Sequence, residues 1–336
     1  MNILWNSIVG HQGNIDRLKL LCRENKVPHA MLFCGIDGIG KKKVAQALAG
    51  AILCHNPVHG TACGECPSCK ALLADIHPDF FQVLPEVKAG SGVIRIDAIR
   101  GMQEKIARLP ILSRQRVVII DDAQTMNEAA SNCLLKTIEE PGEEIYFILI
   151  TNSVMALLDT IISRCTREEF AGLSADVISS VLEQQGISKD KADYLAGFAD
   201  GSVHQAMLLN DEEGISLQQA AMQFFSACTE KRLDMEAVWN EGKKLGSYDK
   251  GQLKQWFSFY IMLIRDQLVL YSGSQVPLYN QIDIRKINDF TGQLTQLELI
   301  RLLKLAREYQ GRLRYSVSLR LMMESFIIKV KDLLED

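Results

Sequence analysis

The sequence predicts an α/β domain built on a parallel sheet, followed by two helical domains. Over about the first 170 residues, short apolar runs alternate with stretches whose apolar residues recur at helical spacing. That alternation is typical of a parallel sheet with flanking helices. After Gly172 the strand-like runs disappear, and four of the nine cysteines lie close together inside the α/β region. The predicted domains are residues 1–170, with a cysteine module at about 54–69, then 171–211 and 212–336.

The strands of the α/β domain are predicted from short apolar runs, several of them rich in β-branched residues. They are 30–34, 80–84, 116–122 with its two final acids, 145–151 and a short strand near 167–170. Helical spacing of apolar residues between these runs predicts the covering helices. Asp97 and Thr125 are expected to cap two of them. Pro110 and Pro141 are expected to end the same two helices.

The second half of the chain is predicted to be helical throughout. Residues 174–185, 189–198 and 203–209 form a small helical group, and long amphipathic helices follow from about residue 212. The net charge of −4 argues against a generally basic surface for nucleic acid. No apolar run approaches the ~18–20 residues of a membrane span, and the first residues lack the pattern of a signal peptide. We therefore expect a cytoplasmic protein with no membrane partner.

The cysteine module carries a C-x8-C-x2-C-x2-C array formed by Cys54, Cys63, Cys66 and Cys69. Zinc prefers tetrahedral thiolate coordination, and each C-x2-C turn brings two sulfurs onto one ion. A four-sulfur site has no open coordination position, so the sequence predicts a structural zinc ion that holds a short polar loop together. Two alternatives stay open: reduced cysteines without metal, and His55 or His59 as a ligand in place of Cys54.

A phosphate-binding loop is predicted at "GIDGIGKKKVAQALA", residues 35–49. Gly35, Gly40 and Lys41 follow the G-x-x-x-x-G-K spacing, with Gly38 between them. The loop follows a predicted strand and opens a predicted helix, where backbone N–H groups can cradle phosphates. Gly35, Gly38, Gly40 and Lys41 are therefore candidate residues for binding ATP or ADP.

Two departures weaken the case for hydrolysis at this loop. Asp121 ends a predicted strand where such folds place the acid that engages Mg²⁺, but Lys42 stands where Ser or Thr should ligate the metal. Asp122 replaces the Glu that commonly follows and polarises the attacking water. Competent hydrolysis, nucleotide binding without turnover, an empty vestigial pocket and a purely structural turn are the alternatives at this stage.

Three motifs resemble those of clamp-loader subunits of the AAA+ class. "SIVGHQ" (7–12) is similar to the nucleotide-edge motif, "NCLLKTIEEP" (132–141) to the helix after the acidic strand, and "ISRC" (162–165) to the Ser-Arg-Cys motif. A zinc module after the phosphate-loop helix is also a bacterial clamp-loader trait. The resemblance is specific over about residues 1–210 and diffuse beyond.

Within that class the sequence is most similar to the delta-prime family of bacterial DNA polymerase III subunits. "HPDF" (77–80) and "IRIDAIRGMQEKI" (94–106) resemble segments of that family. The alternative is a catalytically active tau/gamma-type ATPase, which has an intact Gly-Lys-Ser/Thr loop and an Asp-Glu pair. That family also carries an arginine where this chain has His204.

The resemblance implies a hetero-pentameric ring with tau/gamma and delta subunits that loads a sliding clamp on primed DNA during DNA replication. It implies a subunit of the DNA polymerase III holoenzyme with deficient or weak ATPase activity, which presents Arg164 in trans to a neighbour's ATP. A guanidinium is permanently charged and can neutralise charge on a transferring phosphate. The alternative is a surface arginine paired with Asp159 or Glu168.

Further roles follow from the same resemblance. Asn152 matches the first sensor position, where an amide orients water or the γ-phosphate, or is only architectural. The helical domain at 212–336 corresponds to the collar through which the subunits join. Four cations near the helix that faces the ring's interior in that family form either a weak phosphate contact or an ordinary solvated face. They are Lys105, Arg108, Arg114 and Arg116.

Overall fold

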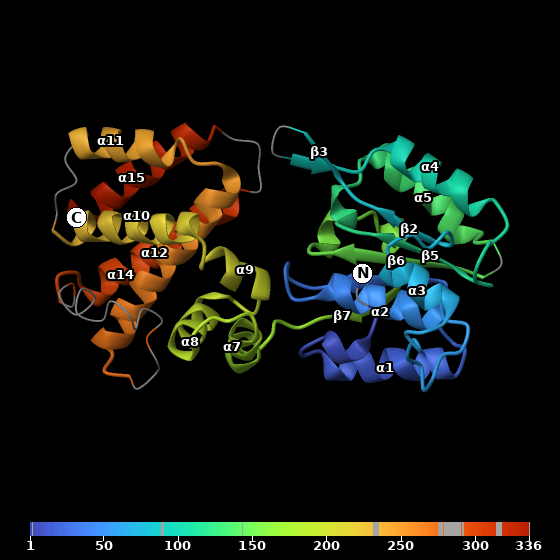
Figure 1. Cartoon of the computed structure of the whole chain (residues 1–336). Coiled ribbons are helices and arrows are strands. Elements are labelled where there is room, and N and C mark those ends of the chain that lie inside the picture. Colours follow the sequence, from blue (N-terminus) through green and yellow to red (C-terminus); the bar gives the residue numbers. More distant parts are fainter. Residues whose placement is uncertain are drawn as a thin grey trace. The chain divides into compact units, whose positions relative to one another are not determined.

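The computed structural model divides the chain into two compact units (Figure 1). The first unit is Met1–Val181 with Gly201–His204, and the second is Leu182–Asp200 with Gln205–Asp336. The division into three domains with limits near 170 and 211 stays a prediction. The structure describes all residues except 2, 89–90, 143, 231–234, 275–277, 279–289, 291, 314–317 and 336.

The first unit is built on a parallel five-stranded sheet with the strand order β2-β5-β6-β1-β7. The strands are β1 (Ala30–Cys34), β2 (Phe80–Val83), β5 (Arg116–Ile120), β6 (Ile145–Thr151) and β7 (Thr166–Glu169). The predicted α/β class is confirmed, and each predicted strand appears within a residue or two of its expected limits. Because the strands are parallel, the loops that follow β1, β5 and β6 meet at one edge of the sheet.

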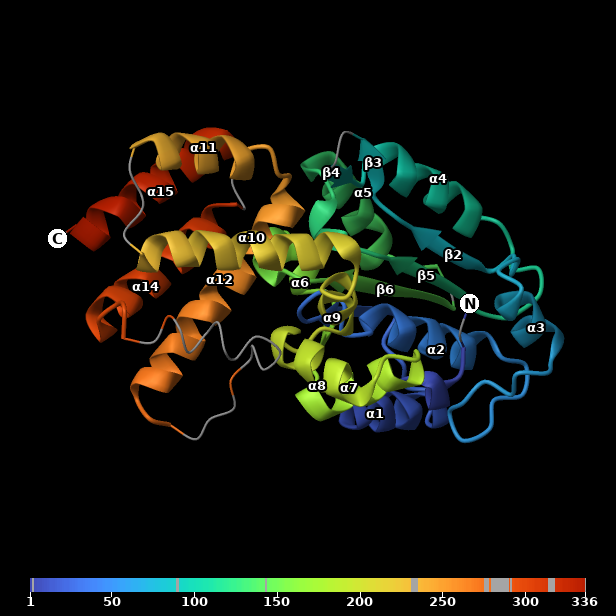
Figure 2. The ribbon, with the colours of Figure 1, turned by 60° about the vertical axis from the view of Figure 1, so that its left-hand side comes forward.

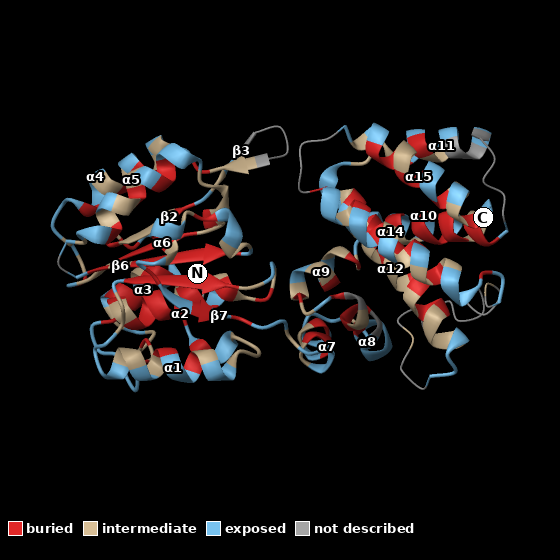
Figure 3. Ribbon diagram, turned by 180° about the vertical axis from the view of Figure 1, so that it is seen from behind, coloured by how far each residue is buried: buried red, intermediate tan, exposed pale blue. Residues whose placement is uncertain are grey.

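Helices cover both faces of this sheet, as the alternation of its side chains requires (Figures 1 and 2). Met31 and Phe33 of β1 pack toward one face, whereas Leu32 and Cys34 pack toward the other. The first face is covered by α1 (Gln12–Arg23), α2 (Lys41–Leu53) and α3 (Pro67–Leu73). The second is covered by α4 (Ile96–Ile106), α5 (Glu128–Glu139) and α6 (Asp159–Ile162). Figure 3 shows the strands buried and the outer helix faces exposed.

Two predicted helix caps are wrong. The cap of α4 is Arg95, which places Asp97 inside the first turn. The cap of α5 is Asn127, whose side chain accepts a hydrogen bond from the N–H of Ala130. Thr125 instead ends a short 3-10 helix, η2 (Ala123–Thr125). Apolar spacing locates a helix but does not identify which of several nearby polar residues accepts the first N–H.

Several short elements were not predicted from the sequence. The strands β3 (Glu86–Lys88) and β4 (Ser91–Val93) form an antiparallel pair outside the main sheet. Two further 3-10 helices are η1 (Trp5–Ser7) and η3 (Val154–Ala156). Segments of three residues are too short to show either apolar period.

The helices predicted after the sheet are confirmed. They are α7 (Ala175–Gln184), α8 (Lys189–Phe198) and α9 (Val203–Leu208), then α10 (Glu212–Thr229), α11 (Met235–Leu245), α12 (Lys250–Tyr271), α14 (Gln296–Arg312) and α15 (Leu319–Glu335). The core of the second unit is aromatic: Trp256 stacks on Tyr260 with centroids 5.3 Å apart, and Phe326 lies 5.3 Å from Tyr309. Within the described residues, no helix is long and apolar enough to cross a membrane.

Candidate functional site

The loop between β1 and α2 has the backbone of a phosphate cradle. Gly38 and Gly40 adopt φ values of +74° and +100°, which L side chains rarely tolerate, and Gly40 caps α2. Lys41 begins the helix and is 5% exposed. Its ammonium donates hydrogen bonds to the carbonyl oxygens of Gly35 at 2.7 Å and Ile36 at 2.6 Å. The side chain of Lys41 therefore folds back onto the loop and is hydrogen-bonded to its backbone.

The electrostatic surroundings of Lys41 are mixed. Burial lowers the pKa of its ammonium, while the carboxylates of Asp37, Asp122 and Asp121 act in the opposite direction. The carbonyl acceptors and the nearby acids favour the charged form of this lysine and oppose the effect of its burial.

Lys42 reaches the acid that the sequence assigned to Mg²⁺. Its Nζ lies 2.9 Å from Oδ2 of Asp121, and the two side chains are 43% and 17% exposed. The structure thus brings Lys41, Lys42 and Asp121 together at the carboxyl edge of the sheet. One ammonium contacts the loop carbonyls and the other contacts the carboxylate.

Gln124, which the sequence reasoning missed, joins the ends of β5 and β6. Its Nε2 donates to Oδ1 of Asp122 at 2.9 Å, and its Oε1 accepts from the hydroxyl of Thr151 at 2.9 Å and the backbone N–H of Asn152 at 3.3 Å. Asp122 is therefore already engaged, and the side chain of Asn152 is exposed. No motif marks Gln124, because two of its three contacts are made with Thr151 and Asn152 at the end of a different strand.

His204 lies directly against the phosphate loop. Its backbone N–H donates to the carbonyl of Gly38 at 3.3 Å. A Cβ placed on Gly38 would lie 2.3 Å from the Cβ of His204 and 2.4 Å from the hydroxyl of Ser202. Gly38 is thus required both by its φ and by this close approach.

The four cysteines of the predicted zinc site form one cluster, with all four sulfurs within 4.8 Å of one another. The Sγ atoms of Cys54 and Cys66 are 3.9 Å apart, as are those of Cys63 and Cys69. Tetrahedral coordination with Zn–S bonds of ~2.3 Å needs sulfurs ~3.8 Å apart. The cluster could therefore hold a metal ion. His55 and His59 are not part of it.

Backbone N–H groups already point at several of these sulfurs. The N–H of Cys63 donates to Cys54, that of Cys66 to Cys63, and that of Cys69 to Cys66. Donation from Glu65 and Cys66 lowers the pKa of the Cys63 thiol to about 6, whereas burial raises the pKa of the Cys54 and Cys69 thiols. Such N–H···S contacts orient thiolates for a metal.

A buried polar network fastens this module to the sheet. Nδ1 of His77 accepts from the N–H of Asp79 at 3.0 Å, so Nε2 carries the proton toward the hydroxyls of Ser68 and Ser113, at 3.0 and 3.2 Å. Both hydroxyls donate to the carbonyl of Leu53, the last residue of α2. This tautomer leaves neither serine activated as a nucleophile, so the network is structural.

Arg164 lies just after α6 on the surface of the first unit. Its Nη2 is 2.7 Å from a carboxylate oxygen of Glu139, at the end of α5, and its Nη1 donates to the carbonyl of Thr160 at 3.0 Å. The side chain is 39% exposed. Its partner is therefore neither Asp159 nor Glu168, the two that the sequence left as alternatives.

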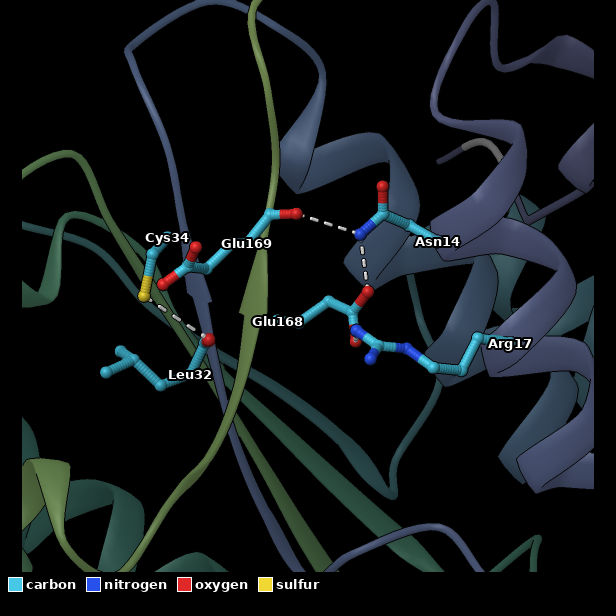
Figure 4. Close-up of polar contacts among 6 residues, drawn as sticks. All are labelled: Asn14, Arg17, Leu32, Cys34, Glu168 and Glu169. Atoms are coloured by element: carbon cyan, nitrogen blue, oxygen red, sulfur yellow. Dashed lines mark hydrogen bonds and ion pairs between the residues drawn. The ribbon is translucent and has the colours of Figure 1, made fainter.

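Glu168 is instead held by α1 (Figure 4). Arg17 forms an ion pair with one of its carboxylate oxygens, and Asn14 donates to the other. Asn14 also donates to the backbone carbonyl of Glu169 at 3.0 Å. These contacts hold the edge strand β7 against α1. Because Glu168 is engaged there, the ion pair of Arg164 is made with Glu139, at the end of α5 on the opposite face of the sheet.

The predicted basic cluster does not behave as one surface. The guanidinium of Arg116 donates to the carbonyl oxygens of Ile106 and Arg108 and so satisfies the end of α4. Arg114 lines a cavity of about 640 Å³ near the ends of α1 and α2. Lys105 and Arg108 are exposed, and a weak phosphate contact through them stays a prediction.

Comparison with known proteins places the first unit in a family. A model described as "DNA polymerase III, delta subunit" matches residues 10–174. The DNA polymerase III subunit delta' of Bacillus subtilis is 26% identical over 338 residues, covering 99% of this chain and 95% of that protein. The chain belongs to the delta-prime family of clamp-loader subunits. The family's Pseudomonas aeruginosa member is 39% identical over 140 residues, and this match spans 42% of each protein.

The alternative family is more distant. The DNA polymerase III subunit tau/gamma of Haemophilus influenzae is 33% identical over 211 residues, which cover 61% of this chain and 30% of that protein. Of these relatives, the Bacillus subtilis delta' protein matches along almost the full length of both chains, whereas the tau/gamma match is confined to part of each.

Proposed function

We propose that this chain is the delta-prime member of a clamp-loader ring, hydrolyses little or no ATP itself, and supplies Arg164 to a neighbouring subunit's ATP. The ring would be a hetero-pentamer with tau/gamma and delta subunits, loading the sliding clamp on primed DNA within the DNA polymerase III holoenzyme. Family membership supports the assembly. The residues at the sheet edge and at Arg164 support the division of labour.

One contrast carries the proposal. The guanidinium of Arg164 is accessible at the surface, whereas the carboxylate of Asp121 in the chain's own phosphate-binding site is already paired with the ammonium of Lys42. The ion pair between Arg164 and Glu139 has both side chains substantially exposed, at 39% and 45%. Such exposed pairs are worth about 0–1 kcal/mol. Moving the guanidinium from Glu139 to a neighbour's γ-phosphate therefore costs little and gains a charge-assisted contact.

The chain's own loop lacks the parts for hydrolysis. Position 42 offers an ammonium in place of a hydroxyl, and Asp122 is bound by Gln124 in place of a water. ATP or ADP bound at Gly35, Gly38, Gly40 and Lys41, with Asp121 and Asn152 at its edge, would then stabilise the subunit without turnover. The family's ATP-splitting role would fall to the tau/gamma neighbours.

The cysteine cluster completes the proposal as a structural zinc site. Its ligands would be Cys54, Cys63, Cys66 and Cys69, whose sulfur spacing suits a tetrahedral ion. All four positions are taken by protein sulfurs, so the ion would support the module and do no chemistry.

The test is ATP hydrolysis by a reconstituted ring that contains Arg164→Ala. Removing a trans arginine lowers hydrolysis at its site by about 10³–10⁵-fold. We therefore expect the neighbouring subunit to stop hydrolysing ATP at the site that Arg164 would contact, and clamp loading to fail. Arg167→Ala is the matched control, because Arg167 is an exposed arginine close by that pairs with Glu169. Unchanged ring hydrolysis in Arg164→Ala would refute the role. Steady turnover by the isolated chain would favour the tau/gamma-type alternative.

A further inference from the structure

We infer that the Lys42 ammonium takes the place of the divalent cation in this phosphate loop, so that the loop binds a nucleoside polyphosphate without metal. The inference rests on the proposed non-hydrolysing site and adds the ionic state of its ligand. It also assigns Lys42 a binding role in place of a mere loss of the hydroxyl.

The residues present do not fit Mg²⁺. That ion demands near-ideal octahedral oxygen ligands at ~2.0–2.1 Å, and a phosphate loop supplies them through a hydroxyl at position 42 and, by way of Asp121, a carboxylate. Here Nζ of Lys42 is 2.9 Å from Oδ2 of Asp121. A dication placed beside Asp121 would meet an ammonium at contact distance, and the carboxylate already has a cation. Like charges at that distance repel strongly where water is partly excluded.

The anion cradle itself is retained. Lys41 is 5% exposed, and its ammonium is held by loop carbonyls of Gly35 and Ile36. The glycines at 38 and 40 keep the φ values that turn N–H groups toward a ligand. A polyphosphate would therefore meet two ammonium groups, those of Lys41 and Lys42, in place of one ammonium and one metal ion.

Charge balance at this edge of the sheet accounts for the ion pair between Lys42 and Asp121. Asp37, Asp121 and Asp122 all act on Lys41, so this edge of the sheet carries three carboxylates. Without a metal, such a group would repel phosphate. The second ammonium offsets one carboxylate permanently, which removes the need for a dication to do so.

The experiment is equilibrium binding of a fluorescent ATP analogue to the isolated chain, with Mg²⁺ and with EDTA. We expect wild-type affinity to be the same within about twofold in both conditions. Lys42→Thr restores the hydroxyl and frees Asp121, so its affinity should rise at least about tenfold with Mg²⁺, which corresponds to ~1.4 kcal/mol. Lys43→Thr is the matched control, since Lys43 is exposed on the same turn of α2 and should leave binding independent of metal.

A second measurement reports the metal directly. Mn²⁺ binding by electron paramagnetic resonance, with the nucleotide present, should be detected for Lys42→Thr and not for the wild-type chain. Strong Mg²⁺ dependence in the wild type, no nucleotide binding by the wild type, or a Lys42→Thr variant that ignores metal would each overturn the inference. None of these outcomes bears on Arg164, whose test uses ring hydrolysis, so the two proposals fail separately.

Discussion

The two ends of helix α2 differ in the charged groups that they bring together. At its first residues, Lys41 and Lys42 satisfy loop carbonyls and the carboxylate of Asp121. At its last residues, Leu53 accepts hydrogen bonds from two serine hydroxyls, and Cys54 enters a cluster of four sulfurs. The first end contains its own cations. The second gathers thiols that can become anionic, and backbone N–H groups donate to several of them.

The difference indicates where this protein depends on something outside the chain. A sequence that places a lysine beside an acid no longer needs a metal there, whereas thiolates packed within 4.8 Å of one another repel unless a cation lies between them. One end of α2 is therefore complete as folded. The other would be completed by the proposed metal ion, and removal of that ion is expected to have the largest effect.

Loss of a cysteine ligand should disrupt the cysteine cluster at the C-terminal end of α2. Cys66→Ser removes one of four sulfurs, so we expect bound zinc to fall well below about one equivalent and stability to drop by several kcal/mol. Structural Zn²⁺ contributes about 10–16 kcal/mol to binding in small peptides, which sets the upper bound. The measurements are elemental analysis and urea unfolding.

Cys133→Ser provides the control for that variant. Cys133 lies outside the cluster, and its Sγ donates to Oε1 of Gln103, a contact that a serine hydroxyl can keep. We expect full zinc content and near-wild-type stability. If Cys66→Ser kept its zinc and its stability, the view that this end of α2 needs an external cation would be wrong.

A smaller loss of stability is expected at Asp79, which lies near the C-terminal end of α2 and is satisfied by hydrogen bonds from the chain itself. Asp79 is 2% exposed, and its carboxylate accepts N–H groups of Ile111, Leu112 and Ser113 at 2.7–2.8 Å. Asp79→Asn points an NH₂ group at backbone donors, so we expect a loss of about 2–4 kcal/mol without loss of zinc. Asp75→Asn, at an exposed position, should change stability by less than about 0.5 kcal/mol. Equal effects of the two variants would show that the buried carboxylate is not supporting the loop.

These sites also show what the sequence could and could not predict. The glycine spacing, Lys42 and the four cysteines were identified because each local chain segment carries the whole pattern. Most contacts of Gln124, Glu139 and the His77 network were not, because they join residues 9 to 60 positions apart that meet only after the sheet forms. The helix caps at Asp97 and Thr125 failed for a different reason, since neighbouring polar residues competed for the same role.

The smallest effect is expected from acidification, through His77. Burial lowers the pKa of its imidazole below the ordinary 6.5, with the carboxylate of Asp79 opposing and His55 adding to the shift. Nδ1 accepts the N–H of Asp79, so a second proton would break that bond. The unfolded chain binds the proton below pH ~6.5 while the folded chain resists it. Stability from this group is therefore fully present above that pH and is lost as pH falls.

Urea unfolding at several pH values between about 7 and 5 measures this slope, which for one proton cannot exceed about 1.4 kcal/mol per pH unit. His77→Asn lowers stability at every pH but should flatten the difference between neutral and acidic conditions. Zinc release in acid affects both proteins alike and cancels when their slopes are subtracted. A His77→Asn slope equal to that of the wild type would assign the acid sensitivity to the thiolates alone. The second end of α2 would then depend on its metal and owe nothing measurable to the neutral imidazole.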